Sequence, residues 1–173
     1  MIHQTGSNPA GLASENAREV LARRATTLNK IRQYFLAQGV LEVETPLLRE
    51  CGVTDPQLEN IRAEKPFKRN EWLYLQTSPE YAMKQLIALG SGSIYQLCKA
   101  FRKDPIGKYH NVEFTILEWY RVGFSLEQLM QDVAAVVTSV GMAEEREVVT
   151  YQQLFQQLLN IDPLTAPLSL IHI

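Results

Sequence analysis

The sequence has little cysteine and no long apolar run. Its two cysteines, Cys51 and Cys98, stand far apart without a CxxC spacing, so neither a zinc site nor a disulfide framework is expected. No apolar stretch approaches the roughly 20 residues that a membrane-spanning helix needs. Residues 1–13 also lack the apolar centre of a signal peptide. These absences are typical of a cytoplasmic protein without a membrane partner.

Neither sign of charge is in excess. The chain has 17 basic and 19 acidic residues, giving a formal net charge of -2. Proteins that bind nucleic acid through phosphate contacts usually carry a basic surplus, so the composition disfavours a nucleic-acid partner. The 173 residues are 46% hydrophobic and 21% charged, which is enough for one globular domain with a hydrophobic core.

The pattern of apolar, cap and turn residues predicts helices that alternate with short strands. Residues 1–13 are expected to form a flexible arm. A helix is predicted to begin near Ser14 and to end at Gly39 in a left-handed C-cap. Further elements are predicted as strands over 40–44, 59–63, 72–76, 94–102 and 113–122, and as helices over 78–89, 125–140 and 151–160. Ser78 is expected to cap its helix, with Pro79 in the first turn.

The strands over 94–102 and 113–122 are expected to form a hairpin whose connecting loop, 103–112, carries function. Side chains alternate between the two faces of a strand. With the expected alignment, one face presents Arg102, Phe114, Glu118 and Tyr120, and the other presents the core residues Tyr95, Leu97, Phe101, Leu117 and Trp119. The helix over 125–140 is expected to place Leu126, Leu129, Met130, Val133 and Val137 on one face.

The first of these faces combines groups that suit a nucleotide and an amine. An arginine can hold a phosphate through two parallel hydrogen bonds, and an exposed phenylalanine can stack on a base. A partly buried carboxylate can pair with an ammonium group. From spacing alone, however, a solvated sheet face with one buried ion pair is the commoner explanation for such a set. Both interpretations therefore remain open at the level of residue pattern.

Three ordered segments resemble motifs of the class II aminoacyl-tRNA synthetases, closest to the lysine-specific group. Residues 39–46 (GVLEVETP) resemble motif 1, and residues 101–104 (FRKD) with 110–120 (HNVEFTILEWY) resemble motif 2. Residues 77–84 (TSPEYAMK) are similar to the segment that precedes motif 2. The resemblance implies an α+β fold of the class II catalytic-domain type, an antiparallel sheet flanked by helices, present as its N-terminal half. It also implies a homodimer formed through the motif 1 region.

Within that family, the sequences of residues 78–81 and 117–121 are similar to those of a bacterial branch of truncated lysyl-tRNA synthetase paralogues that modify elongation factor P. Lysyl-tRNA synthetases carry an anticodon-binding OB-fold domain before motif 1, whereas only a short arm and one helix are expected before motif 1 in this sequence. The resemblance implies ATP-dependent activation of lysine or (R)-β-lysine as the adenylate and its transfer to a lysine side chain of elongation factor P. Two alternatives stay open: an enzyme that charges tRNA, and a non-catalytic paralogue that binds a partner.

The resemblance also implies roles for individual residues. Arg102 would act catalytically on the α-phosphate, Asp104 would accept a hydrogen bond from the adenine amino group, and Phe114 would stack on adenine. The implied ATP-binding set is Arg102, Lys103, Asp104, His110, Asn111 and Phe114. The implied substrate-binding set is Ser78, Pro79, Glu80, Glu118 and Tyr120. Magnesium is expected with ATP, but no metal ligand is assigned within this chain.

The chain departs from the family pattern at several places. Lys103-Asp104 stands where the family usually has Asn-Glu, and Lys108 stands where arginine is usual. Motif 3 and the C-terminal acidic residues are absent, so a fragment with these limits is expected to be inactive alone. Residues 14–167 are interpreted as a partial catalytic domain. Residues 168–173 correspond to a translated sequencing-adapter string, CTG TCT CTT ATA CAC ATC, and are interpreted as an artefact.

Overall fold

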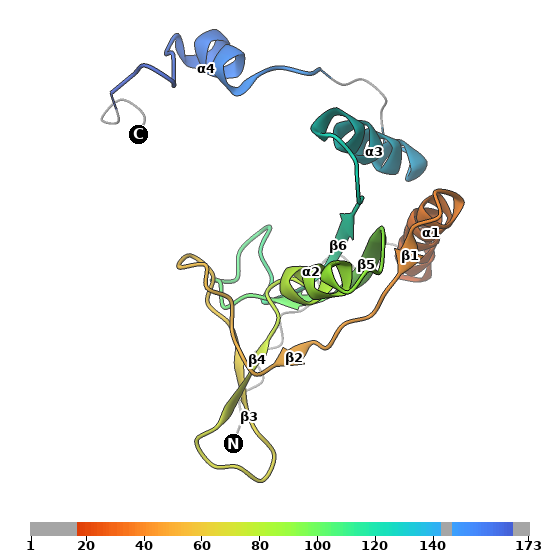
Figure 1. Cartoon of the computed structure of the whole chain (residues 1–173), viewed down its shortest axis with the longest axis vertical. Coiled ribbons are helices and arrows are strands. Elements are labelled where there is room, and N and C mark those ends of the chain that lie inside the picture. Colours follow the sequence, from red (N-terminus) through yellow and green to blue (C-terminus); the bar gives the residue numbers. More distant parts are fainter. Residues whose placement is uncertain (1–16, 143–146, 168–173) are drawn as a thin grey trace. The chain divides into compact units, whose positions relative to one another are not determined.

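A computed structural model describes residues 17–142 and 147–167 of the chain (Figure 1). It divides into two compact units, with the boundary after Gly141. The predicted arm over 1–13, the helix start near Ser14 and the interpreted artefact over 168–173 lie outside the described residues.

The first unit carries all the predicted site residues. Its elements are α1 (Ala17–Ala37), β1 (Leu41–Glu42), β2 (Leu48–Arg49), β3 (Arg62–Glu64), β4 (Trp72–Leu75), α2 (Glu80–Ala88), β5 (Ile94–Phe101), β6 (Glu113–Tyr120) and α3 (Leu126–Ser139). The second unit contains α4 (Tyr151–Leu159), which begins with a capping box between Thr150 and Gln153. Within the described residues, no helix is long and apolar enough to cross a bilayer.

The central sheet has the strand order β1-β5-β6. β5 and β6 form the predicted antiparallel hairpin, whereas β1 runs parallel to β5. The α+β prediction is confirmed, but the sheet is mixed rather than purely antiparallel. The strand predicted over 40–44 is reduced to Leu41–Glu42, after which one further backbone bond joins Val43 N–H to the Tyr95 carbonyl at 2.9 Å. Gly39 adopts a φ of 67° after α1, as predicted for a left-handed C-cap.

The hydrophobic core lies between one face of this sheet and the helices α1 and α3. Its buried members are Phe35, Val40, Tyr95 and Val136, with Leu97, Leu117 and Trp119 packed against them. The Phe35 and Tyr95 rings stack with their centroids 4.4 Å apart. The predicted core face of the hairpin is therefore confirmed for these members, and the opposite face is left for the site.

α2 and α3 differ from their predictions in detail. Pro79, not Ser78, is the residue that precedes the first helical turn of α2. The Ser78 hydroxyl instead accepts a bond from the Glu80 N–H two residues on, at 3.2 Å, which makes a local turn and not a helix cap. On α3, four residues of the predicted apolar face are exposed: Leu126, Leu129, Met130 and Val133. α3 buries Asp132 and Val136, because two aromatic donors of the core hydrogen-bond to Asp132.

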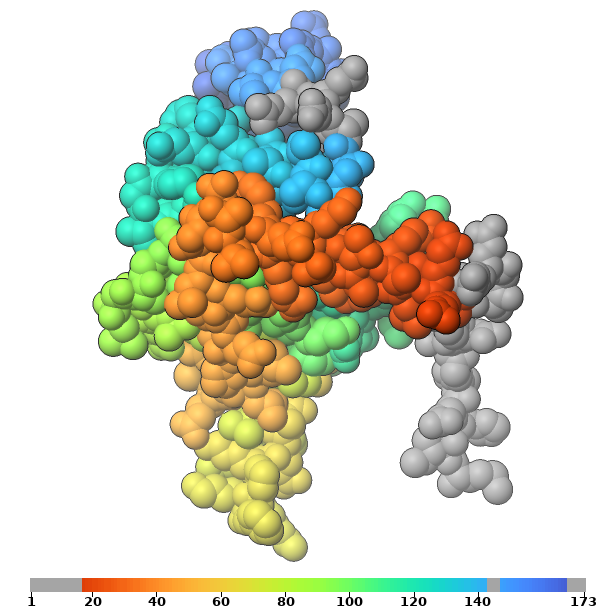
Figure 2. Space-filling model, turned by 90° about the vertical axis from the view of Figure 1, so that its right-hand side faces the viewer, coloured from red at the N-terminus to blue at the C-terminus, as the bar shows by residue number. Residues whose placement is uncertain are grey.

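A second sheet, with the strand order β2-β4-β3, was only partly predicted. The β3–β4 hairpin (yellow) projects from the rest of the first unit in both views (Figures 1 and 2). The end of β4 joins the two sheets: Gln76 N–H donates to the Leu47 carbonyl, and the Gln76 carbonyl accepts from Phe101 N–H, each at 2.9 Å. This junction places the chain leading into α2 beside the end of β5.

Two core tyrosines predict a loss of stability at alkaline pH. Burial, followed by hydrogen bonds to Glu42 and Asp132 respectively, raises the pKa of Tyr95 and of Tyr34 to about 12. In the unfolded chain a tyrosine titrates near pH 10, so the native state holds its protons longer. The stabilisation is complete below about pH 10 and is lost as the pH rises towards 12. Urea midpoints measured across this window should fall, and Tyr95→Phe should make the fall shallower; an identical slope would contradict the assignment.

Candidate active site

The register of the β5–β6 hairpin places the predicted face as expected. Gln96 pairs with Glu118 and Ala100 pairs with Phe114, so these side chains lie on the same face. The Arg102 N–H continues the ladder by donating to the Val112 carbonyl at 3.0 Å. The predicted alignment of the Arg102 face with the Phe114 face is thus confirmed.

Arg102 lies against an aromatic ring and a backbone carbonyl. Its guanidinium carbon is 5.2 Å from the centre of the Phe114 ring, a cation–π distance. Its Nε donates a long bond of 3.4 Å to the Thr77 carbonyl. These contacts orient the side chain without involving a carboxylate partner for the guanidinium. An arginine held in this way presents a fork that suits a phosphate.

The segment that leads into α2 brings the other predicted residues to the same region. Pro79 is fully buried and anchors the turn, while Glu80 begins the helix. Ser78 and Glu80 line a cavity of about 340 Å³ together with Arg102. The lining also includes a segment earlier in the chain: Arg49, Cys51–Asp55, Leu58 and Asn60. The structure therefore joins predicted residues from two separate motifs around one cavity.

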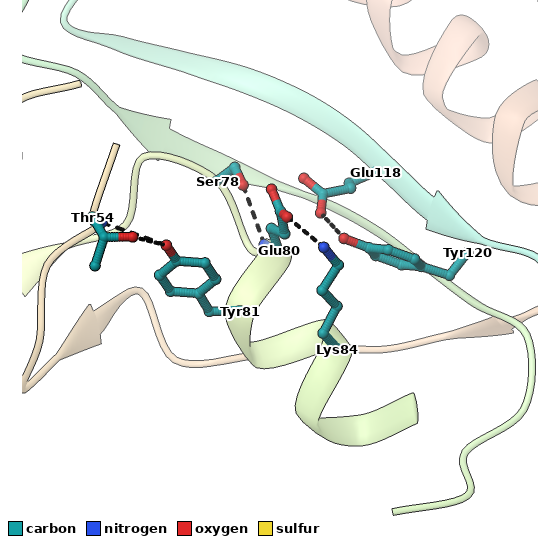
Figure 3. A network of polar contacts seen from close by, with 7 residues as sticks. All are labelled: Thr54, Ser78, Glu80, Tyr81, Lys84, Glu118 and Tyr120. Atoms are coloured by element: carbon teal, nitrogen blue, oxygen red, sulfur yellow. Dashed lines mark hydrogen bonds and ion pairs between the residues drawn. The ribbon is translucent and has the colours of Figure 1, made fainter. Parts of the chain in front are cut away.

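A cluster of carboxylates lies along this face (Figure 3). The Tyr120 hydroxyl donates to Glu118 Oε1 at 2.8 Å, and Lys84 Nζ donates to Glu80 Oε1 at 2.6 Å. Burial is the main cause that raises the pKa of Tyr120, followed by its hydrogen bond to Glu118 and by the charges of Glu118 and Glu80. Tyr120 is therefore a neutral donor near neutral pH. Because two carboxylates influence one tyrosine, the cluster is suited to bind a cation.

The connecting loop does not bring its predicted residues into the cavity. The ammonium group of Lys103 pairs with Glu59, and both side chains are mostly exposed. His110 lies at the tip, where its carbonyl accepts from Gly107 N–H at 3.1 Å. His110 and Asn111 are exposed and Asp104 is half-buried. This arrangement does not test the roles implied for Lys103, Asp104, His110 and Asn111, which stay predictions.

Several residues of the site were not predicted from the sequence. The Tyr81 hydroxyl lies 2.8 Å from Thr54 Oγ1 and links α2 to the earlier segment that also lines the cavity. Arg49, Thr54 and Tyr81 also line a neighbouring cavity of about 510 Å³. Only Lys84 carried a usable signal, since it follows Glu80 at the i,i+4 spacing of helical ion pairs. The wall residues depend on long-range packing that no local pattern reveals.

Comparison with known proteins identifies the class to which this fold and site belong. A family model described as "tRNA synthetases class II (D, K and N)" matches residues 8–163. The chain therefore belongs to the class II tRNA synthetases of this group, a family that uses ATP. A solved structure of asparaginyl-tRNA synthetase from Pyrococcus horikoshii, complexed with asparaginyl-adenylate, aligns with a TM-score of 0.63 at 21% identity, over 72% of this chain and 28% of that one. This structural similarity confirms the predicted fold, and no function is inferred from it.

Some curated relatives share a higher sequence identity with this chain than that solved structure does. The elongation factor P–(R)-β-lysine ligase of Pseudoalteromonas translucida (strain TAC 125) is 49% identical over 152 residues, which cover 86% of this chain and 47% of that protein. The corresponding ligase of Histophilus somni (strain 2336) is 46% identical over the same shares. The predicted similarity to this branch is confirmed. The chain spans about half the length of the curated relatives it matches.

Proposed function

We propose that the chain carries the ATP- and amine-binding part of a ligase that activates lysine or (R)-β-lysine as the adenylate and transfers it to a lysine side chain of elongation factor P. One observation carries the proposal. The guanidinium of Arg102, the ring of Phe114 and the carboxylates of Glu80 and Glu118 lie on one continuous region of the first unit. The names of the relatives support the choice of amine and of acceptor.

The nucleotide part of the proposal is based on Arg102 and Phe114. In adenylate formation, a carboxylate oxygen of the amino acid bonds to the α-phosphorus of ATP while the bond to pyrophosphate breaks. Negative charge shifts onto the phosphate oxygens during this step, and a fixed guanidinium stabilises that charge. The Phe114 ring, already in contact with the guanidinium, supplies a face on which adenine can stack. Magnesium stays a prediction, since the resemblance places its ligands beyond this chain.

The amine part of the proposal rests on Glu80, Glu118 and Tyr120. An ammonium group prefers charge-assisted bonds to carboxylates, and Glu118 is already aligned by the Tyr120 hydroxyl. Ser78 and the buried Pro79 fix the backbone from which Glu80 extends. In the second step, the amine of the acceptor lysine attacks the carbonyl carbon of the adenylate and AMP leaves. No residue of this chain is assigned to that proton transfer.

We extend the proposal to a homodimer formed through the motif 1 region. Leu36 on α1 and Leu41 on β1 are exposed in the single chain. Exposed leucines next to a helix–strand junction are suited to a partner surface. Cytoplasmic location stays a prediction from the sequence.

The test compares two acceptors with the protein expressed from its complete reading frame. We expect lysine-dependent exchange of pyrophosphate into ATP, followed by labelling of elongation factor P and not of tRNA. Labelling of tRNA without labelling of the factor would favour the tRNA-charging alternative. Absence of any amino-acid-dependent exchange would favour the non-catalytic paralogue.

A further inference from the structure

Lys84 places an ammonium group inside the carboxylate cluster. It lies one helical turn after Glu80 on α2, and its Nζ is 2.6 Å from Glu80 Oε1. Figure 3 shows the Lys84 side chain rising from the helix towards Glu80 and the Tyr120 hydroxyl, which itself donates to Glu118. The protein therefore supplies its own cation at the place where the proposed function puts the ammonium of the substrate.

We propose that Lys84 is an internal counter-ion that competes with the substrate ammonium for Glu80 and thereby sets the affinity of the pocket for lysine. This inference rests on the proposed function, because it takes Glu80 and Glu118 as the groups that bind the amine. It assigns to Lys84 a role in specificity rather than in the chemical step.

The competition follows from the number of charges in the cluster. Two carboxylates and one ammonium leave a net charge of one negative unit, so the pocket without substrate is largely compensated. An incoming ammonium either displaces Lys84 from Glu80 or shares the carboxylate with it. Displacement breaks the ion pair between Lys84 and Glu80, and sharing places two ammonium groups close together. Both routes lower the affinity for the substrate relative to a pocket without Lys84.

Lys84 remains charged under ordinary conditions. Its hydrogen bond to Glu80 is the main cause that raises its pKa above the usual value, with a smaller contribution from the charge of Glu118. The competitor is therefore not removed by a change of pH near neutrality. A cation with few other contacts gains little by displacing Lys84, whereas an amino acid that is also held through its other groups gains more. The internal counter-ion thus favours the complete substrate over simple amines.

The decisive variant is Lys84→Gln in the protein expressed from its complete reading frame. Glutamine has a helix propensity close to that of lysine, so α2 should be preserved. We expect the KM for lysine in pyrophosphate exchange to fall about two- to fivefold, the range set by an exposed ion pair. The KM for ATP and the kcat should stay near those of the parent protein. Lys84→Arg keeps the charge and should keep the KM for lysine.

A matched control removes an equivalent ion pair outside the cluster. Lys99 pairs with Glu113 at 2.8 Å, and the two side chains are 48% and 52% exposed, against 57% and 47% for Lys84 and Glu80. Lys99→Gln should leave the KM for lysine unchanged. An unchanged or higher KM in Lys84→Gln would overturn the inference and show that the pair only orders Glu80. A fall of equal size in Lys84→Arg would also overturn it, because the charge would then not be the cause.

The outcome separates this inference from the proposed function. A parent protein that shows no lysine-dependent exchange refutes the proposed function and the inference with it. A parent protein that is active while Lys84→Gln shows no fall in KM refutes only the inference.

Discussion

Replacing Arg102 with alanine is expected to reduce lysine-dependent pyrophosphate exchange by about 100-fold or more, because a preorganised charge facing the transferred phosphate contributes roughly that much. The fold should survive, since the contacts of this side chain within the described residues are a long bond of 3.4 Å to the Thr77 carbonyl and a cation–π contact with the Phe114 ring. The loss should appear in kcat and not only in the KM for ATP. The exchange activity of Arg102→Lys should lie between those of the parent protein and Arg102→Ala, because lysine keeps the charge but loses the planar fork.

Arg62 offers a matched control for this experiment. Its guanidinium carbon lies 5.6 Å from the centre of the Trp72 ring in the second sheet, a contact similar to that of Arg102 with Phe114. Arg62 lines neither of the two cavities described above. Arg62→Ala should therefore leave exchange within about twofold of the parent value. Near-normal exchange in Arg102→Ala, with urea unfolding unchanged, would refute the assigned role.

The hairpin that carries Arg102 could be predicted because its determinants are local. β5 and β6 end within two residues of their predicted limits. The alternation of side chains then placed Phe114 and Glu118 on one face and Trp119 on the other. Gly39 was likewise identifiable, since a glycine after a run of helical spacing is typical of a left-handed C-cap. Local propensity and period were enough for these features.

The features that could not be predicted depend on contacts between distant parts of the chain. The parallel pairing of β1 with β5 joins Leu41 to Ile94, and no turn signal specifies it. The segment over 49–60, which lines the cavity, is predicted from the sequence as mainly loop. Hydrogen bonds such as that between Thr54 and Tyr81 fix its position. On α3 the apolar period identified one face of the helix, but it could not indicate that Asp132 is buried, because that depends on hydrogen bonds from Tyr34 and Trp119, which are distant in the sequence.

Asp132 is the acceptor at the centre of a buried network that joins three elements of the first unit. The Tyr34 hydroxyl of α1 donates to its Oδ1, and the Trp119 indole N–H of β6 donates to its Oδ2 at 3.0 Å. The Arg121 Nε lies 3.3 Å from Oδ2, and the side chains of Arg121 and Asp132 are only 8% and 4% exposed. Arg121 also stacks on Phe124, with 4.3 Å from its guanidinium carbon to the ring centre. One carboxylate thus satisfies two donors and balances one buried cation.

Asp132→Ala is therefore expected to lower the free energy of unfolding by about 3 kcal/mol or more, because it leaves the Arg121 charge buried and unpaired and removes the acceptor of two aromatic donors. Asp132→Asn keeps the shape but turns an amide N–H₂ towards at least one of these donors, so it should also destabilise the protein. Urea unfolding of the full-length protein measures both. Glu127→Ala, at an exposed position in the first turn of the same helix, should cost less than about 1 kcal/mol. If Asp132→Ala cost no more than this control, the network would not hold α1, β6 and α3 together.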